Sequence, residues 1–259
     1  MLTHHKLQQL EKWFIEYADS CIHEHPGAAD ELILKKDHTL QVQDVVRIIA
    51  AELRCDEALT LMALAAALLH DVGRFRQFID YGTFADSRSE DHAELGLKVI
   101  HEYNLLDDCE PQYAEMLEFA IRHHNKLAIP VEGDEEAIYL AKMLRDADKL
   151  DIFRVVTGYY HDNDSEAISA MLGLPDNHTI SEKICKEILE GRIPRMEHLA
   201  SCNDLKLMQM SWIYDINFPV TLRMIHQRGY LEMLSRSLPD LPEIIKIYNT
   251  IDQYIKRTV

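Results

Sequence analysis

The chain has 259 residues, with 27 Lys and Arg against 44 Asp and Glu, which gives a formal net charge of −17. This length suits one large domain or a domain with an appendage, and the acidic charge repels polyanions, so we exclude extended nucleic acid as a partner. A small anionic ligand remains compatible with this charge, because a bound cation reverses the sign of the field inside one pocket.

The five cysteines are widely spaced and form no C-x-x-C pair. This spacing indicates a reducing compartment rather than a disulfide framework. The first 20 residues mix charges and glutamines with apolar residues, unlike a signal peptide, and no stretch approaches the ~18 uninterrupted apolar residues of a membrane span. We expect a cytoplasmic protein without a membrane partner, and the sequence indicates no particular oligomeric state.

Helical periodicity is found along most of the chain, whereas strand-like alternation is scarce. Apolar residues recur at helical spacing in residues 7–18, 42–49 and 184–189. We predict an all-α fold with three parts. These are an N-terminal helix packed on the core in 1–29, a helical core in 30–158, and a C-terminal helical extension in 159–259 that belongs to the same globular unit.

The apolar run Leu64–Leu69 predicts a buried helix, yet it is followed at once by His70 and Asp71. Gly73 is a candidate helix stop, so the pair could simply close the helix. Both side chains also bind cations, however, and two such groups at the end of a core helix need a reason to be there.

Four further polar side chains occupy positions where the helical repeat predicts an apolar residue. His38, for example, stands four residues before Val42. His101 lies off its apolar stripe and is expected to be exposed. His123 lies about 100° around the helix from its neighbour, so it could flank a site. The four residues on apolar stripes are His38, His92, His124 and Asp148.

Each polar position also has a simpler explanation. A single His on an apolar face is more often a hydrogen-bonded core residue, and Asp148 could pair with Arg145 or Lys149. Several such groups together are harder to explain, because each unpaired buried charge costs several kcal/mol. One shared cation removes this cost, and imidazoles with carboxylates suit Fe, Mn, Zn, Co or Ni.

Short sequence motifs around these positions resemble those of the HD superfamily of metal-dependent phosphohydrolases. The order of His38, then His70 with Asp71, then Asp148 is similar to the H...HD...D signature of that family. The resemblance covers about residues 30–155. The words that carry it are ALLHDVGRF, DHAELG, AIRHHN and RDADKLD.

The resemblance implies an HD-domain helical bundle and a specific set of ligands. It assigns one metal to His38, His70, Asp71 and Asp148, with Asp71 bridging to a second metal. It assigns that second metal to His92 and His124, with His123 as the substitute. The implied cofactor is therefore one or two divalent transition-metal ions, with two ions favoured.

Phosphate binding needs further donors close to the metal ligands. By position the nearest cationic candidates are Arg74, Lys126 and Lys149, and Arg145 and Arg122 are weaker. We predict catalytic roles for Asp71, Arg74 and Lys149. For each cation a solvated charge or surface ion pair is the simpler role. Asp146 and Asp151 could each orient a ligand histidine through its second ring nitrogen.

These residues predict hydrolysis of a small phosphorylated metabolite, a nucleotide among the candidates, by a metal-activated water. The resemblance argues against two substrates of the family. The E-D pair of stringent-response nucleotide hydrolases and the GYP sequence of cyclic dinucleotide phosphodiesterases are both missing, since VGRF follows the HD pair. Two alternatives remain, namely a diiron oxygenase of the HD type and a non-catalytic sensor that keeps the metal.

Overall fold

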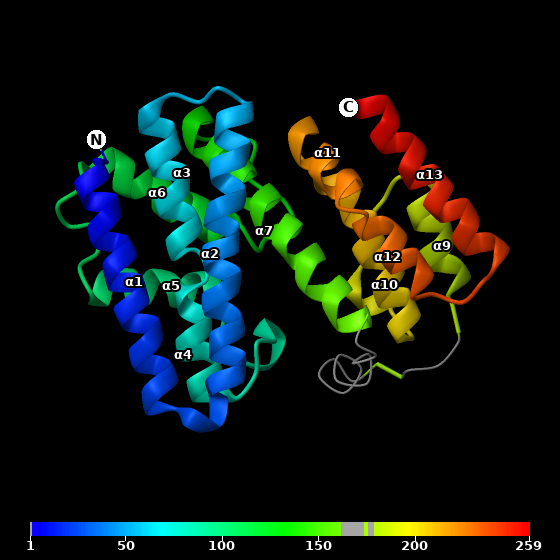
Figure 1. Cartoon of the computed structure of the whole chain (residues 1–259), viewed down its shortest axis with the longest axis horizontal. Coiled ribbons are helices and arrows are strands. Elements are labelled where there is room, and N and C mark those ends of the chain that lie inside the picture. Colours follow the sequence, from blue (N-terminus) through cyan, green and yellow to red (C-terminus); the bar gives the residue numbers. More distant parts are fainter. Residues whose placement is uncertain (1, 162–173, 176–178) are drawn as a thin grey trace. The chain divides into compact units, whose positions relative to one another are not determined.

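The computed structural model of the chain describes residues 2–161, 174–175 and 179–259. The described residues form α-helices and short 3-10 helices and no strand (Figure 1), so the predicted all-α fold is confirmed. The chain divides into two compact units, Met1–Asp148 and Lys149–Val259. The division lies inside one helix, α7 (Glu135–His161), and the boundary predicted after residue 158 falls further along the same helix.

In the first unit, α2 packs against α3, α4 packs against α5, and α6 packs against both α3 and α5. The N-terminal helix α1 lies on α2 and α3. These helices form one bundle whose interior is filled by α3. Their bounds are α1 His4–Glu24, η1 Pro26–Ala28, α2 Ala29–Glu52, α3 Glu57–Leu69, α4 Val72–Tyr81, η2 Asp86–Arg88, α5 His92–Glu102 and α6 Pro111–His123.

Short acidic side chains fix where two of these helices begin. Asp56 accepts a hydrogen bond of 2.8 Å from the backbone at the start of α3. Asp91 accepts two backbone hydrogen bonds of 3.0 and 3.2 Å at the start of α5. Both satisfy N–H groups that have no partner inside the helix. The cap at Asp91 makes His92 the first residue of α5.

The connection between α3 and α4 is only two residues long, His70 and Asp71. Gly73 lies inside α4, so its predicted role as a helix stop is wrong. A Cβ atom at Gly73 would lie 2.3 Å from the carbonyl oxygen of His92 and 2.4 Å from the nitrogen of Gly96. The glycine therefore allows α4 and α5 to approach closely, which brings the HD pair near His92.

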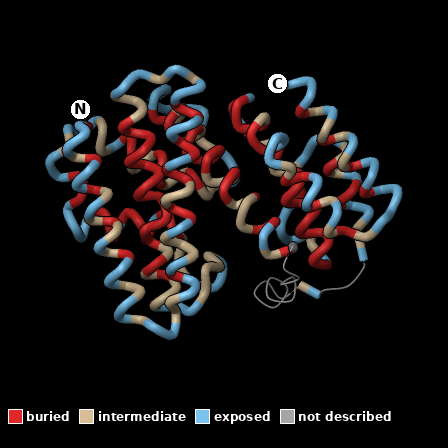
Figure 2. The backbone as a smooth tube through the Cα atoms, viewed as in Figure 1, coloured by how far each residue is buried: buried red, intermediate tan, exposed pale blue. Residues whose placement is uncertain are grey.

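Helix α3 is the core of the first unit, since every residue from Leu61 to Leu69 is buried (Figure 2). The stretch Glu57–Arg88 is long and apolar enough to cross a membrane by length and composition. However, 78% of its most apolar window is buried inside the fold, as in the core helix of a soluble protein. The cytoplasmic location stays a prediction.

The second unit contains the end of α7 and a helical bundle. Helix α13 packs against α9, α11 and α12, and α10 packs against α9 and α12. All ten residues of α10 are buried. The bounds are α9 Glu182–Leu189, η3 Met196–His198, α10 Cys202–Ser211, η4 Trp212–Asp215, α11 Pro219–Gln227, α12 Tyr230–Arg236 and α13 Pro242–Thr258.

Candidate metal centre

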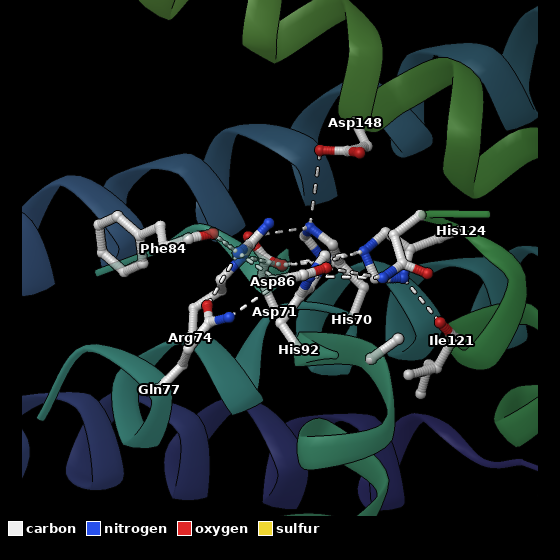
Figure 3. A network of polar contacts seen from close by, with 12 residues as sticks. His70, Asp71, Arg74, Gln77, Phe84, Asp86, His92, Ile121, His124 and Asp148 are labelled. Atoms are coloured by element: carbon white, nitrogen blue, oxygen red, sulfur yellow. Dashed lines mark hydrogen bonds and ion pairs between the residues drawn. The ribbon is translucent and has the colours of Figure 1, made fainter. Parts of the chain in front are cut away.

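The six predicted ligand side chains lie together in the first unit, and Figure 3 labels all of them except His38. The HD pair lies in the connection between α3 and α4, and the other four side chains come from α2, α5, α7 and the end of α6. All six are buried except Asp148, whose side chain is 15% exposed. The residues are His38, His70, Asp71, His92, His124 and Asp148.

One group of ligand atoms gathers at Oδ2 of Asp71. The Nε2 atoms of His38 and His70 each lie 3.7 Å from this oxygen. Oδ1 of Asp148 lies 3.1 Å from Nε2 of His38 and 3.8 Å from Nε2 of His70. Ligand atoms of the two histidines and Asp148 all lie within 4.8 Å of one another, which is close enough for one cation to bind all three.

A second group gathers at the other oxygen of the same carboxylate. Oδ1 of Asp71 lies 3.5 Å from Nε2 of His92 and 3.8 Å from Nε2 of His124. The two Nε2 atoms are 3.0 Å apart. Asp71 therefore presents one oxygen to each group, which is the arrangement of a bridging ligand.

The histidine tautomers fit a metal. Nδ1 of His70 donates to the carbonyl of Ala67 at 2.7 Å, and Nδ1 of His124 donates to the carbonyl of Ile121 at 2.6 Å. With the proton on Nδ1, the lone pair of Nε2 points into the centre. Nε2 of His70 is buried and makes no hydrogen bond among the described residues. Imidazole nitrogens and carboxylates are the donor set that divalent transition metals bind.

The electrostatics of the site keep both residue types in their ligand forms. Burial, together with the neighbouring His92 and His70, lowers the pKa of His124 to about 3. Burial alone would raise the pKa of Asp71, but Lys35, His70 and Arg74 hold it well below its usual value. The imidazole of His124 is therefore neutral and the Asp71 carboxylate is ionised near neutral pH.

Two cationic side chains flank Asp71. Nζ of Lys35 lies 2.8 Å from Oδ2, and Nε of Arg74 lies 3.5 Å from Oδ1. Both cations also face the ring of Phe84, at 5.3 and 5.9 Å from its centroid. Sequence reasoning found Arg74 but missed Lys35. The available signal was its spacing, because Lys35 precedes His38 by three residues and so shares its helix face.

Three other residues named from the sequence have contacts of their own. Lys149 belongs to the second unit, where its Nζ lies 2.7 Å from Oδ2 of Asp215. The ring of His123 packs on Phe119, with ring centroids 4.5 Å apart, and it joins neither group of ligand atoms at Asp71. As predicted, His101 is exposed.

Four of the remaining candidates have other contacts. Lys126 donates to Asp91, and Nε of Arg122 donates to Glu94 at 3.1 Å. Arg145 donates to backbone carbonyls at the end of α6, those of residues 123, 124 and 126. The carboxylate of Asp151 accepts hydrogen bonds of 2.6 and 3.0 Å from Arg154.

Asp86, which sequence reasoning missed, places its carboxylate beside Nδ1 of the ligand candidate His92. Its oxygens lie 2.7 and 2.9 Å from Nδ1 of His92. Burial alone would raise the pKa of Asp86, but the hydrogen bond with His92 and the charge of Arg74 hold it below its usual value. Asp86 reaches the site from a loop, and no helical repeat indicates such a position.

In a comparison with protein families, residues 36–152 fit the family model of the HD domain. No curated protein and no solved structure matches the chain. The matched region contains all six ligand candidates, and HD domains belong to a superfamily of metal-dependent hydrolases. Residues 36–152 therefore form an HD domain.

Proposed function

We propose that the HD domain binds two divalent transition-metal ions and hydrolyses a small phosphate ester, with nucleotides among the candidate substrates. The observation that carries this proposal is the position of Asp71, whose two oxygens face two separate groups of ligand atoms. A carboxylate in this position can bridge two cations, and paired cations suit displacement at phosphorus.

Each group supplies the ligands of one ion. The first site comprises His38, His70 and Asp148 with Oδ2 of Asp71, and the second comprises His92 and His124 with Oδ1. The first site has four ligands and the second has three, so we expect the first site to bind its ion with the higher affinity. Fe, Mn, Co, Ni and Zn all accept this donor set.

Bound ions would supply Lewis acidity and lower the pKa of a coordinated water. In the reaction a water oxygen bonds to phosphorus, the phosphorus–oxygen ester bond breaks, and the leaving alcohol takes up a proton. The chain contributes the charges that hold the substrate. Lys35 and Arg74 flank Asp71 on its two oxygens, so both are placed to donate to phosphoryl oxygens.

Phosphate release from a panel of phosphorylated metabolites tests this function. We expect protein reconstituted with Mn, Co, Ni or Fe to release phosphate from at least one ester, and metal-free protein with excess chelator to release none. Protein that holds two ions per chain and hydrolyses no ester would contradict the proposed reaction.

Oxygen consumption, measured with an oxygen electrode on the same panel of compounds, distinguishes a hydrolase from an oxygenase. Iron-loaded protein that consumes oxygen with a substrate, without hydrolysing an ester, would favour the diiron oxygenase instead. Metal retention with neither activity would favour the sensor.

A further inference from the structure

Asp86 contacts four polar side chains although it belongs to neither group of ligand atoms. It lies at the start of η2, in the connection between α4 and α5. Besides the bonds with His92, it accepts hydrogen bonds from Gln77 at 2.8 Å, Arg74 at 3.2 Å and Asn125 at 3.3 Å. Figure 3 shows this carboxylate beside the His92 ring. Donors from three segments thus fix its oxygens in place.

The ligand histidines differ in what orients their rings. His70 and His124 each donate from Nδ1 to a carbonyl three residues earlier, which their own helices supply. His92 is the first residue of α5, so its helix has no carbonyl three residues earlier to offer. The carboxylate of Asp86 takes that place, at 2.7 Å from Nδ1.

From this difference we propose that Asp86 is a positioning residue for the second cation, and that it sets the affinity of the His92–His124 site without setting that of the first site. The inference rests on the proposed two-ion centre. Asp86 holds the His92 ring so that Nε2 faces Oδ1 of Asp71 at 3.5 Å. A carboxylate behind a ligand imidazole also makes the metal-binding nitrogen more basic.

The first site does not depend on this contact. His38, His70 and Asp148 come from α2, from the end of α3 and from α7. The bond that orients His70 lies within α3 and its C-cap, where Asp86 takes no part. Loss of the Asp86 charge should therefore weaken one of the two binding steps.

Calorimetric titration of the metal-free, full-length chain with Mn²⁺ alone tests the inference. We expect wild-type protein to bind two ions in distinguishable steps. In Asp86→Asn the first step should stay within about threefold of wild type, and the second should weaken by about 10–100-fold, the usual effect of losing such a partner. Asp86→Glu, which keeps a carboxylate, should recover part of the second step.

Asp80→Asn is the matched control, because it removes the same charge from an exposed position at the end of α4. It should leave both steps unchanged. A first step like that of wild type in Asp86→Asn also reports that this variant is folded.

The other outcomes overturn the inference in distinguishable ways. Unchanged binding of both ions in Asp86→Asn, or equal weakening of both in Asp86→Asn and Asp86→Glu, would contradict the role of Asp86 while the two-ion centre stands. Wild-type protein that binds one ion or none would contradict the proposed centre, and this inference with it.

Discussion

Buried carboxylates occur in both units of the chain, but they are compensated in different ways. Asp204 in α10 is fully buried and accepts hydrogen bonds from the backbone of Ser181 at 2.8 Å, the hydroxyl of Ser181 at 2.6 Å and the backbone of Ala200 at 2.9 Å. Asp71 in the first unit accepts a hydrogen bond from Lys35 at 2.8 Å, but it also faces four imidazole nitrogens at 3.5 to 3.8 Å. Burial of a charged group alone does not indicate function.

The contrast lies in where the donors and acceptors point. Around Asp204 the chain supplies hydrogen-bond donors at normal bonding distances, so the carboxylate is a structural anchor. Around Asp71 the ligand atoms converge from five helices at distances that suit a cation between them. A functional centre is therefore recognised by convergence of such atoms, and paired variants of these two aspartates test the distinction.

The largest expected effect is that of Asp71→Ala. Removal of the carboxylate shared by both groups should abolish metal retention. Loss of a residue that only hydrogen-bonds to a metal ligand lowers activity by ~10–100-fold, and the turnover of this variant should fall by more than that. Metal content by mass spectrometry and phosphate release measure this. A variant that keeps two ions per chain would show that Asp71 is an anchor like Asp204.

Asp204→Ala in the second unit is the counterpart of Asp71→Ala. It leaves the donors of Ser181 and Ala200 without their acceptor, so we expect the free energy of unfolding to fall by about 3–5 kcal/mol. Metal content per folded chain should stay at the wild-type value. Urea denaturation measures the free energy of unfolding, and mass spectrometry measures the metal content. Loss of metal from folded Asp204→Ala would contradict the interpretation of Asp204 as a purely structural residue.

Acid should destabilise the metal-free protein through the imidazoles of the site. The pKa of His124 is about 3 in the fold against 6.5 as its ordinary value, because of burial and the neighbouring His92 and His70. Between these two values the unfolded chain binds a proton that the folded chain does not. Stability is therefore present above pH 6.5 and is lost as the pH falls, with a slope of up to about 1.4 kcal/mol per pH unit.

Urea denaturation of metal-free protein at pH 6.5 and pH 4.5 measures this loss, and His124→Gln should reduce it. Carboxylates titrate near the lower end of this window in both proteins, so the difference between wild type and His124→Gln isolates the imidazole. A pH dependence that is the same in His124→Gln as in wild type would contradict the account of the buried imidazole.

The smallest expected effect is that of His101→Ala. His101 is 60% exposed and pairs with Glu118 at 2.7 Å. Because exposed ion pairs contribute about 1 kcal/mol or less, stability should change little and metal content should not change at all. The variant is thus the surface control for every histidine substitution at the centre.

Helical periodicity singled out four of the six converging side chains, because it fixes which face of a helix a residue occupies. His70 and Asp71 were found from their place at the end of an apolar run, and the resemblance assigned all six as ligands. His38, His92, His124 and Asp148 interrupt apolar stripes, and the structure buries these stripes against one another. Periodicity also predicted the all-α fold, since strand-like alternation is scarce along the chain.

Contacts that depend on loops and on close approach between helices were not predictable in this way. Asp86 bonds to His92 because of the path of the chain between α4 and α5, whereas Asp151, one of the two residues predicted to orient a ligand, pairs with Arg154. Gly73 was interpreted as a helix stop, but the close packing of α4 on α5 explains it. Local sequence patterns do not indicate the distances between residues that only the tertiary fold brings together.

We propose that Asp71 joins two cation sites, and electron paramagnetic resonance of the Mn²⁺-loaded protein measures whether two bound ions share it. We expect two Mn²⁺ ions per chain with the signal of an exchange-coupled pair, which is replaced by a single-ion signal in His92→Ala. Two uncoupled ions, or less than one ion per chain in wild-type protein, would contradict it.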